Sequence, residues 1–167
     1  WTPYGGSEIY TPGKPLGIDS DGSNYIAMAV DQLGVELFYI DSIGATPVLI
    51  NRVDTEGNAE KVALTAEGVY VACDDAGALY VPIDSFSSES VSYRFAEDLT
   101  VDHISIKGST ACLTLGSKGI ALYDVSDSTD PKEKGIFPVG YSYTSIFWGD
   151  KLLVCTREGI QIITIEQ

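Results

Sequence analysis

His103 is the only histidine of the 167-residue chain, and it directly follows Asp102 in the stretch VDHIS. An imidazole beside a carboxylate is the arrangement with which enzymes activate a serine or move a proton. Serines are plentiful, but the G-x-S-x-G turn that exposes the nucleophile of many α/β-hydrolases does not occur. A zinc site needs further ligands, and the sequence has neither a second histidine nor a C-x-x-C pair. We therefore predict no catalytic residue and no metal site, with a hydrolase or lyase as the less favoured alternative.

Two acidic stretches have oxygen donors in alternation, as calcium-binding loops do. They are DSDGSN at residues 19–24 and SDSTDP at residues 126–131. An EF-hand loop needs glycine at its sixth position and glutamate at its twelfth, but the first stretch has Gly22 at the fourth and Val30 at the twelfth. Asp, Asn and Ser side chains bond to their own backbone in turns, so we predict two turns. No glycine-rich phosphate loop occurs, and we predict no cofactor.

The three cysteines and a cluster of aromatic residues are the other side chains with chemical potential. Cys73, Cys112 and Cys155 lie in apolar, strand-like stretches, which predicts three buried thiols. The aromatic cluster is PVGYSYTSIFW, in which Tyr141 and Tyr143 precede Phe147 and Trp148. For the two tyrosines a recognition patch and packing between sheets both stay open. For Phe147 and Trp148 we predict packing.

The charge of the chain limits its partners. It has 24 acidic and 10 basic side chains, for a formal net charge of −14. Such a surface repels phosphate backbones and anionic lipids, so we expect no nucleic acid partner. It favours solubility, or the binding of a cation or a basic partner. No apolar run approaches the roughly 18 residues of a membrane span, which predicts no transmembrane segment. Because the chain begins at Trp1 rather than Met, we expect that a signal or other domains precede it.

A repeat organises the sequence. Similar segments begin at Gly34, Gly77, Gly119 and Gly159, and successive glycines are 43, 42 and 40 residues apart. Two apolar, strand-like segments precede each glycine, and one begins at it. In the first three copies a polar turn and a more charged segment follow. We name these predicted strands a, b, c and d in chain order.

Four short strands in about 42 residues are typical of one blade of a β-propeller. Strand c is apolar on both faces in the first and fourth copies, which predicts that neighbouring blades cover both sides of a sheet. We therefore predict an all-β fold, a single β-propeller domain of about four antiparallel blades with four strands each. The repeats span residues 16–58, 59–101, 102–143 and 144–167.

The fourth repeat ends after strand c and lacks a strand d. Residues 7–15 resemble a strand d and its exit into strand a, so we predict that this N-terminal strand completes the last blade. The alternative is that the open ends pair between two chains, as a homodimer with a larger ring.

The third repeat resembles a known family. Residues 119–135, GIALYDVSDSTDPKEKG, resemble the LVIVD repeat of propeller-type proteins, including its Asp-Pro turn. Pro82 in the second repeat and Thr164 in the fourth replace the residue at the position of Asp124. Pro82 predicts a bulge or an early end to strand pairing. The resemblance implies an exported protein, whether extracellular, periplasmic or at the cell surface, and it implies no shared catalytic set.

In a propeller the d–a and b–c turns lie on one face, which is commonly the binding face. The d–a turns carry Lys14, Glu60, His103, Tyr141 and Tyr143, and the b–c turns carry Asp31, Asp74, Asp75, Lys118 and Arg157. We predict that these residues form the ligand-binding face of a non-catalytic module. Its expected partner is a protein or a small ligand such as a carbohydrate. A purely structural segment of a larger propeller is the alternative from another class.

Overall fold

A computed structural model describes residues 8–22, 24–42, 44–87 and 91–165 of the chain. These residues form fifteen β-strands and one short 3₁₀-helix, η1 (Ile83–Phe86), with no α-helix among them. No helix in this part of the chain is long and apolar enough to cross a membrane. The protein is therefore all-β, as the sequence predicts.

The strands form four antiparallel sheets in which consecutive strands pair in chain order. Blade 1 consists of β1 (Gly17–Ser20), β2 (Tyr25–Ala29), β3 (Val35–Tyr39) and β4 (Val48–Val53). Blade 2 consists of β5 (Lys61–Leu64), β6 (Gly68–Ala72), β7 (Ala78–Pro82) and β8 (Tyr93–Phe95). Blade 3 consists of β9 (His103–Lys107), β10 (Thr110–Thr114), β11 (Ile120–Asp124) and β12 (Lys132–Phe137). Blade 4 has only β13 (Ser142–Trp148), β14 (Lys151–Thr156) and β15 (Gly159–Thr164).

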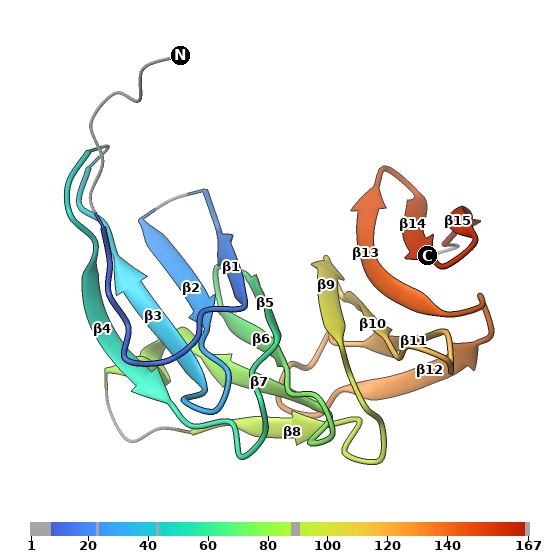
Figure 1. Cartoon of the computed structure of the whole chain (residues 1–167), viewed down its shortest axis with the longest axis horizontal. Coiled ribbons are helices and arrows are strands. Elements are labelled where there is room, and N and C mark those ends of the chain that lie inside the picture. Colours follow the sequence, from blue (N-terminus) through green and yellow to red (C-terminus); the bar gives the residue numbers. More distant parts are fainter. Residues whose placement is uncertain (1–7, 23, 43, 88–90, 166–167) are drawn as a thin grey trace.

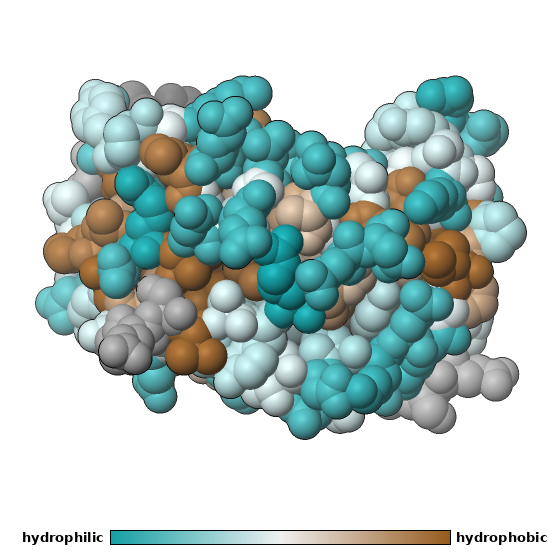
Figure 2. All heavy atoms as spheres, turned by 90° about the horizontal axis from the view of Figure 1, so that it is seen from below, coloured by the Kyte–Doolittle hydropathy of each residue, from teal (hydrophilic) through white to brown (hydrophobic). Residues whose placement is uncertain are grey.

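The four sheets are the blades of a β-propeller, arranged as an open arc (Figure 1). Blade 1 lies at the left of Figure 1, blade 2 at the centre, blade 3 to its right and blade 4 at the upper right. The first strands of the sheets, β1, β5, β9 and β13, line a central groove of about 450 Å³. The last strands form the outer rim, where charged residues and exposed apolar residues mix (Figure 2). In this arrangement the turns between strands b and c and between strands d and a lie at one end of the groove.

The repeating glycine has a physical reason in this arrangement. Gly34 and Gly119 follow the b–c turn with positive φ values of 82° and 89°. A Cβ on Gly34 would lie 2.1 Å from the carbonyl oxygen of Val53, and one on Gly119 would lie 2.2 Å from that of Phe137. The outer strand thus passes too close for any side chain, and the left-handed φ also favours glycine.

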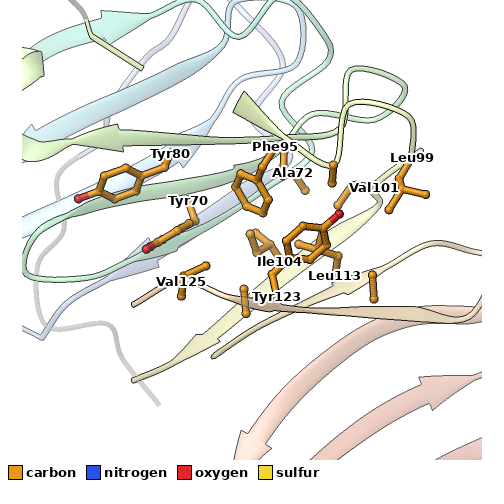
Figure 3. Close-up of a cluster of buried hydrophobic side chains, with 14 of the residues drawn as sticks. Tyr70, Ala72, Tyr80, Phe95, Leu99, Val101, Ile104, Leu113, Tyr123 and Val125 are labelled. Carbon is orange, nitrogen blue, oxygen red and sulfur yellow. The ribbon is translucent and has the colours of Figure 1, made fainter. Parts of the chain in front are cut away.

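The core lies between the blades. Alternate residues of each strand face opposite neighbours, so Ala121 and Tyr123 of β11 pack against blade 2 while Ile120 faces blade 4. The Phe95 ring at the end of β8 meets the Tyr123 ring edge-on, with centroids 5.3 Å apart (Figure 3). Tyr70 and Tyr80 of blade 2 join the same cluster. The prediction that neighbouring blades cover both faces of a sheet is confirmed for blades 2 and 3. It is wrong for the fourth copy, where Ile160 and Ile162 of β15 are exposed because blade 4 has a neighbour on one side alone in the described structure.

The prediction for the N-terminal strand needs a correction. Residues 8–15 form no strand in the sheet of blade 4, and residue 7 lies outside the described part of the chain. The segment lies against blade 1 instead, where the Thr11 hydroxyl donates to the Glu36 carboxylate at 3.1 Å. The backbone N–H of Leu16 donates to the Ala29 carbonyl at 2.9 Å. These contacts with Glu36 and Ala29 hold the segment on blade 1, away from β15.

Two further expectations fail in blade 4. Cys155 is exposed rather than buried, and Trp148 is 69% exposed rather than packed. Phe147 does pack against the buried cluster between blades 3 and 4. Both exceptions arise because no fifth sheet lies on the far side of blade 4. In blade 2, by contrast, Pro82 ends β7 and the pairing of β7 with β8 stops at Tyr80, which confirms the early end predicted there.

Candidate binding face at the b–c and d–a turns

In blades 1 to 3, backbone bridges join the b–c turn to the d–a turn that leads into the next blade. Asp31 forms an antiparallel bridge with Ala59, with N···O distances of 3.2 and 2.9 Å. Asp74 forms the same bridge with Val101, at 3.2 and 2.8 Å. In blade 3 the N–H of Ser142 donates to Gly116 at 3.0 Å. The two sets of turns are therefore one connected surface, as the sequence predicts from topology.

The bridges depend on a left-handed residue at one position of each b–c turn. The φ values are 49° at Asp31, 52° at Asp74 and 54° at Gly116. Aspartate tolerates this conformation better than most residues that have a Cβ, and glycine tolerates it without strain. The same backbone bend thus occurs at equivalent places of the three turns.

Acidic side chains from different turns come close together at the end of the central groove where the b–c and d–a turns lie, which we call its mouth. Burial, and after it the negative charges of Asp74 and Asp31, raise the pKa of Glu60, while Lys61 and Lys14 oppose the shift. Burial and then the charge of Asp74 also raise the pKa of Asp102. Burial is the larger cause of both shifts, but the contribution of Asp74 to each shows that negative charges lie close together here, and such a place attracts cations.

His103 lies at the same mouth, at the start of β9. Burial first, and the positive charge of Lys61 second, lower the pKa of its imidazole to about 4. Its Nδ1 atom is buried and makes no hydrogen bond in the described structure. The Asp102 carboxylate instead points toward Gly116, where its Oδ2 lies 3.2 Å from the place of a Cβ. The imidazole is thus a weak base at neutral pH, without the carboxylate partner of a catalytic triad.

Tyr141, Tyr143 and Arg157 form a second cluster at the blade 4 end of the face. The tyrosine ring centroids are 5.1 Å apart, and the Arg157 guanidinium carbon lies 4.6 Å from the Tyr141 ring centroid. The backbone N–H of Arg157 donates to the Tyr141 carbonyl at 2.9 Å, which holds the two turns together. Tyr143 and Arg157 are exposed. A partly exposed aromatic pair with a cation beside it suits recognition.

The remaining predicted residues lie at the margin of the face. Lys14 is exposed and acts on Glu60 through its charge. Asp75 and Lys118 are exposed at the tips of their b–c turns. Lys61 also belongs to the face, although the sequence analysis did not name it. Its position directly after Glu60, at the first residue of a strand a, was the signal that would have found it.

The two acidic stretches that resemble calcium loops are accounted for by protein contacts. An Asp19 carboxylate oxygen accepts the N–H of Leu64 at 2.9 Å, which ties blade 1 to blade 2. Asp127 accepts the backbone N–H of Thr129 at 3.0 Å and its hydroxyl at 2.7 Å, as expected for a turn. Ser23 of the first stretch lies outside the described residues. No group of three metal-binding side chains occurs among the residues that are described.

No family model matches the chain, and no curated protein sequence does. The fold is similar to that of several solved structures. The alignment with the computationally designed Ika4 protein covers 96% of this chain and 96% of the Ika4 chain, with a TM-score of 0.73 and 10% identity. A chain of the COPII outer coat vertex on membranes covers 86% of this chain and 44% of its own, with a TM-score of 0.69 and 10% identity. The alignment with a chain of the mitotic checkpoint complex covers 88% of this chain and 46% of that chain, with a TM-score of 0.67 and 14% identity.

This chain therefore spans about half the length of the COPII and checkpoint chains that it matches. At identities this low the likeness shows the fold alone. The chain is a propeller-type module, and its partners must be inferred from its own face.

Proposed function

We propose that this propeller module is a non-catalytic binding protein whose b–c and d–a turns hold a basic segment of another protein. The observation that carries this proposal is the closeness of Asp31, Glu60 and Asp74 at one mouth. A backbone bridge joins Asp31 to Ala59, the neighbour of Glu60, and the charges of Asp74 and Asp31 both act on the Glu60 carboxylate. Because the charges of Asp74 and Asp31 contribute to the raised pKa of Glu60, a bound lysine or arginine would relieve repulsion that the free protein contains. Electrostatic complementarity of this kind speeds association and selects the partner.

The cluster of Tyr141, Tyr143 and Arg157 supports recognition at the same face. Tyrosines and arginines are enriched among the residues that contribute most to protein interfaces. The Tyr143 ring offers apolar area beside the acidic mouth, so one partner segment can use both. A carbohydrate that stacks on the tyrosines is the second candidate, and it is expected to be insensitive to salt.

The state of His103 favours binding over acid–base catalysis. A general base works best with a pKa near the working pH, and the pKa of this imidazole is about 4. The carboxylate of Asp102 points elsewhere. The resemblance of residues 119–135 to LVIVD repeats supports placing the module in an exported or cell-surface protein.

The test is binding of a fluorescent lysine-rich peptide at low and moderate salt. A variant with Asp31→Asn, Glu60→Gln and Asp74→Asn is expected to bind at least about tenfold more weakly, because three charges at the mouth are removed. A matched control carries Asp41→Asn, Asp130→Asn and Asp150→Asn, three exposed acids on turns at the opposite end. Both variants lose the same net charge. An equal loss of affinity in both would show non-specific attraction and would overturn the proposal.

A further inference from the structure

Blade 4 has a free apolar face. Its outward-facing residues are Ile146, Leu153, Cys155, Ile160 and Ile162, and several of them line a shallow hollow of about 210 Å³. Ile160 and Ile162 are 71% and 63% exposed. The repeat places Ile160 where blade 3 has Ile120, which is 1% exposed because blade 4 covers it. Blade 4 thus presents the side chains of an interface between blades, without the neighbour.

The outer edge of blade 4 is also free. Blades 1 to 3 have four strands, but the sheet of blade 4 ends at β15 in the described structure. A Cβ on Gly159 would meet no atom within 4 Å, whereas the equivalent Gly119 touches an outer strand. β15 reads GIQIIT and carries no charged residue. Terminal repeats normally have a polar outer face, and edge strands normally carry charge, so this end is not built to face water.

Blade 1 has the complementary face at the other end of the arc, and it is free over part of its area. Its residues that face away from blade 2 are Ile18, Ile26, Met28, Glu36 and Phe38. Ile18 is exposed and Ile26 and Met28 are half-buried, whereas Glu36 and Phe38 are already buried within the chain. The equivalent residues of blade 2 are buried against blade 1. They are Val62, Val69, Val71, Leu79 and Val81. The two free faces therefore carry the two halves of one further interface between blades.

The two faces do not meet within one chain. Ile18 of β1 is 70% exposed and Ile146 of β13 is 60% exposed, although both lie on inner strands. Figure 1 shows β1 and β13 on opposite sides of the opening of the arc. Chains of about twice this length match the arc with 44% to 46% of their residues, so longer propellers contain it as about half of a chain.

We propose that a second copy of this chain occupies the opening, with blade 4 of each copy packed against blade 1 of the other. The two contacts are identical and related by a two-fold axis along the groove, and together they close a ring of eight blades. Eight blades lie within the usual range for propellers, and closure leaves no free sheet face. Residues 8–16 lead into β1 as strand d leads into strand a inside the chain, so they lie beside β15 of the partner.

The first test is the mass of the purified chain in solution by light scattering and analytical ultracentrifugation. The result expected is a dimer, with Ile162→Lys shifting it to a monomer that keeps its β-sheet circular dichroism. Ile162 is exposed, so the charge is tolerated by the isolated blade. The control is Ile136→Lys, an exposed isoleucine of similar type on β12 that lies away from both free faces. A monomeric wild-type chain, or a dimer that Ile162→Lys leaves intact, would overturn the proposal, as would open polymers.

The second test fixes which faces meet. Cys155 is the only exposed cysteine among the three, and it lies on the free face of blade 4. A short bis-maleimide is expected to cross-link two copies of Met28→Cys through Cys155 and residue 28, and not to cross-link the wild-type chain. Met28→Cys combined with Cys155→Ala should give no cross-linked dimer. Efficient cross-linking of the wild-type chain would mean that two copies of blade 4 face each other, which contradicts the ring.

Discussion

Glu36 is a charged side chain with 1% of its surface exposed, on the face of blade 1 that points away from blade 2. Arg52 and Thr11 both donate to its Oε1 atom, and its Oε2 atom is buried without a partner in the described structure. Removing one partner of a buried ion pair leaves the other charge without compensation. The N-terminal segment is held to blade 1 through this same carboxylate.

Arg52→Met is expected to lower the free energy of unfolding by about 3 kcal/mol, because the buried Glu36 carboxylate loses its main donor. Glu36→Leu combined with Arg52→Met should recover most of that loss, since no buried charge remains. Urea unfolding followed by circular dichroism measures both values. If the double variant were as unstable as the single one, the loss would come from packing rather than from charge.

The imidazole of His103 makes stability depend on pH. Its pKa is about 4 in the folded protein and about 6.5 when unfolded, so the unfolded chain binds the proton more readily. The free energy of unfolding is therefore highest above pH 6.5 and falls by about 1 to 3 kcal/mol as the pH drops toward 4. Glu60 and Asp102 act with the opposite sign, because a raised carboxylate pKa adds stability as the pH falls through it.

His103→Gln separates the two effects. The variant keeps both carboxylates but has no imidazole, so its free energy of unfolding should fall less between pH 6.5 and 4 than that of the wild type. Denaturant titrations at pH 7, 5.5 and 4.5 give the difference directly. If the free energy of unfolding depended on pH equally in the two proteins, His103 would not be held neutral by its surroundings.

At the scale of the element, the repeating glycine corresponds to one close approach of the outer strand in each of blades 1 to 3. Gly119→Ala puts a Cβ 2.2 Å from the Phe137 carbonyl oxygen at a φ of 89°. Gly44 is a matched control, because its φ is 88° but a Cβ there would meet nothing within 4 Å. Thermal unfolding should show a loss of about 1 kcal/mol for Gly44→Ala, from backbone strain alone. Gly119→Ala should lose at least about 2 kcal/mol more, and equal losses would mean that the outer strand yields easily.

The elements themselves were largely predictable from the sequence. The glycine period, the four-strand order and the meeting of the b–c and d–a turns all follow from patterns that are local to one repeat. The place of residues 8–15 was not predictable in this way. A strand d pattern says what a segment resembles but not which sheet receives it, and the contact between Thr11 and Glu36 joins positions that share no pattern.

At the candidate face, too, part of the arrangement was predictable from the sequence and part was not. Topology was enough to bring Asp31, Asp74 and Glu60 to one face, because turns at one end of a meander must lie together. The direction of the Asp102 carboxylate and the isolation of the His103 Nδ1 atom depend on packing between blades. No spacing in the sequence records these, so the imidazole beside a carboxylate suggested more chemistry than the fold allows.

For the whole molecule, the two proposals fit together. A two-fold axis along the groove keeps the candidate face of both copies on the same side of the ring. The ring then offers two acidic mouths to one partner, and a partner with two basic segments gains avidity without any new contact.

The claim on which this account rests is that the b–c and d–a turns form one binding face. NMR titration of the isotope-labelled chain with the lysine-rich peptide tests it most directly, because each backbone amide reports separately. The amides of residues 30–34, 59–61, 73–77 and 101–103 are expected to shift together and to saturate at one peptide concentration. Shifts of equal size at the c–d turn of residues 125–131, or shifts spread evenly over all acidic turns, would contradict the account.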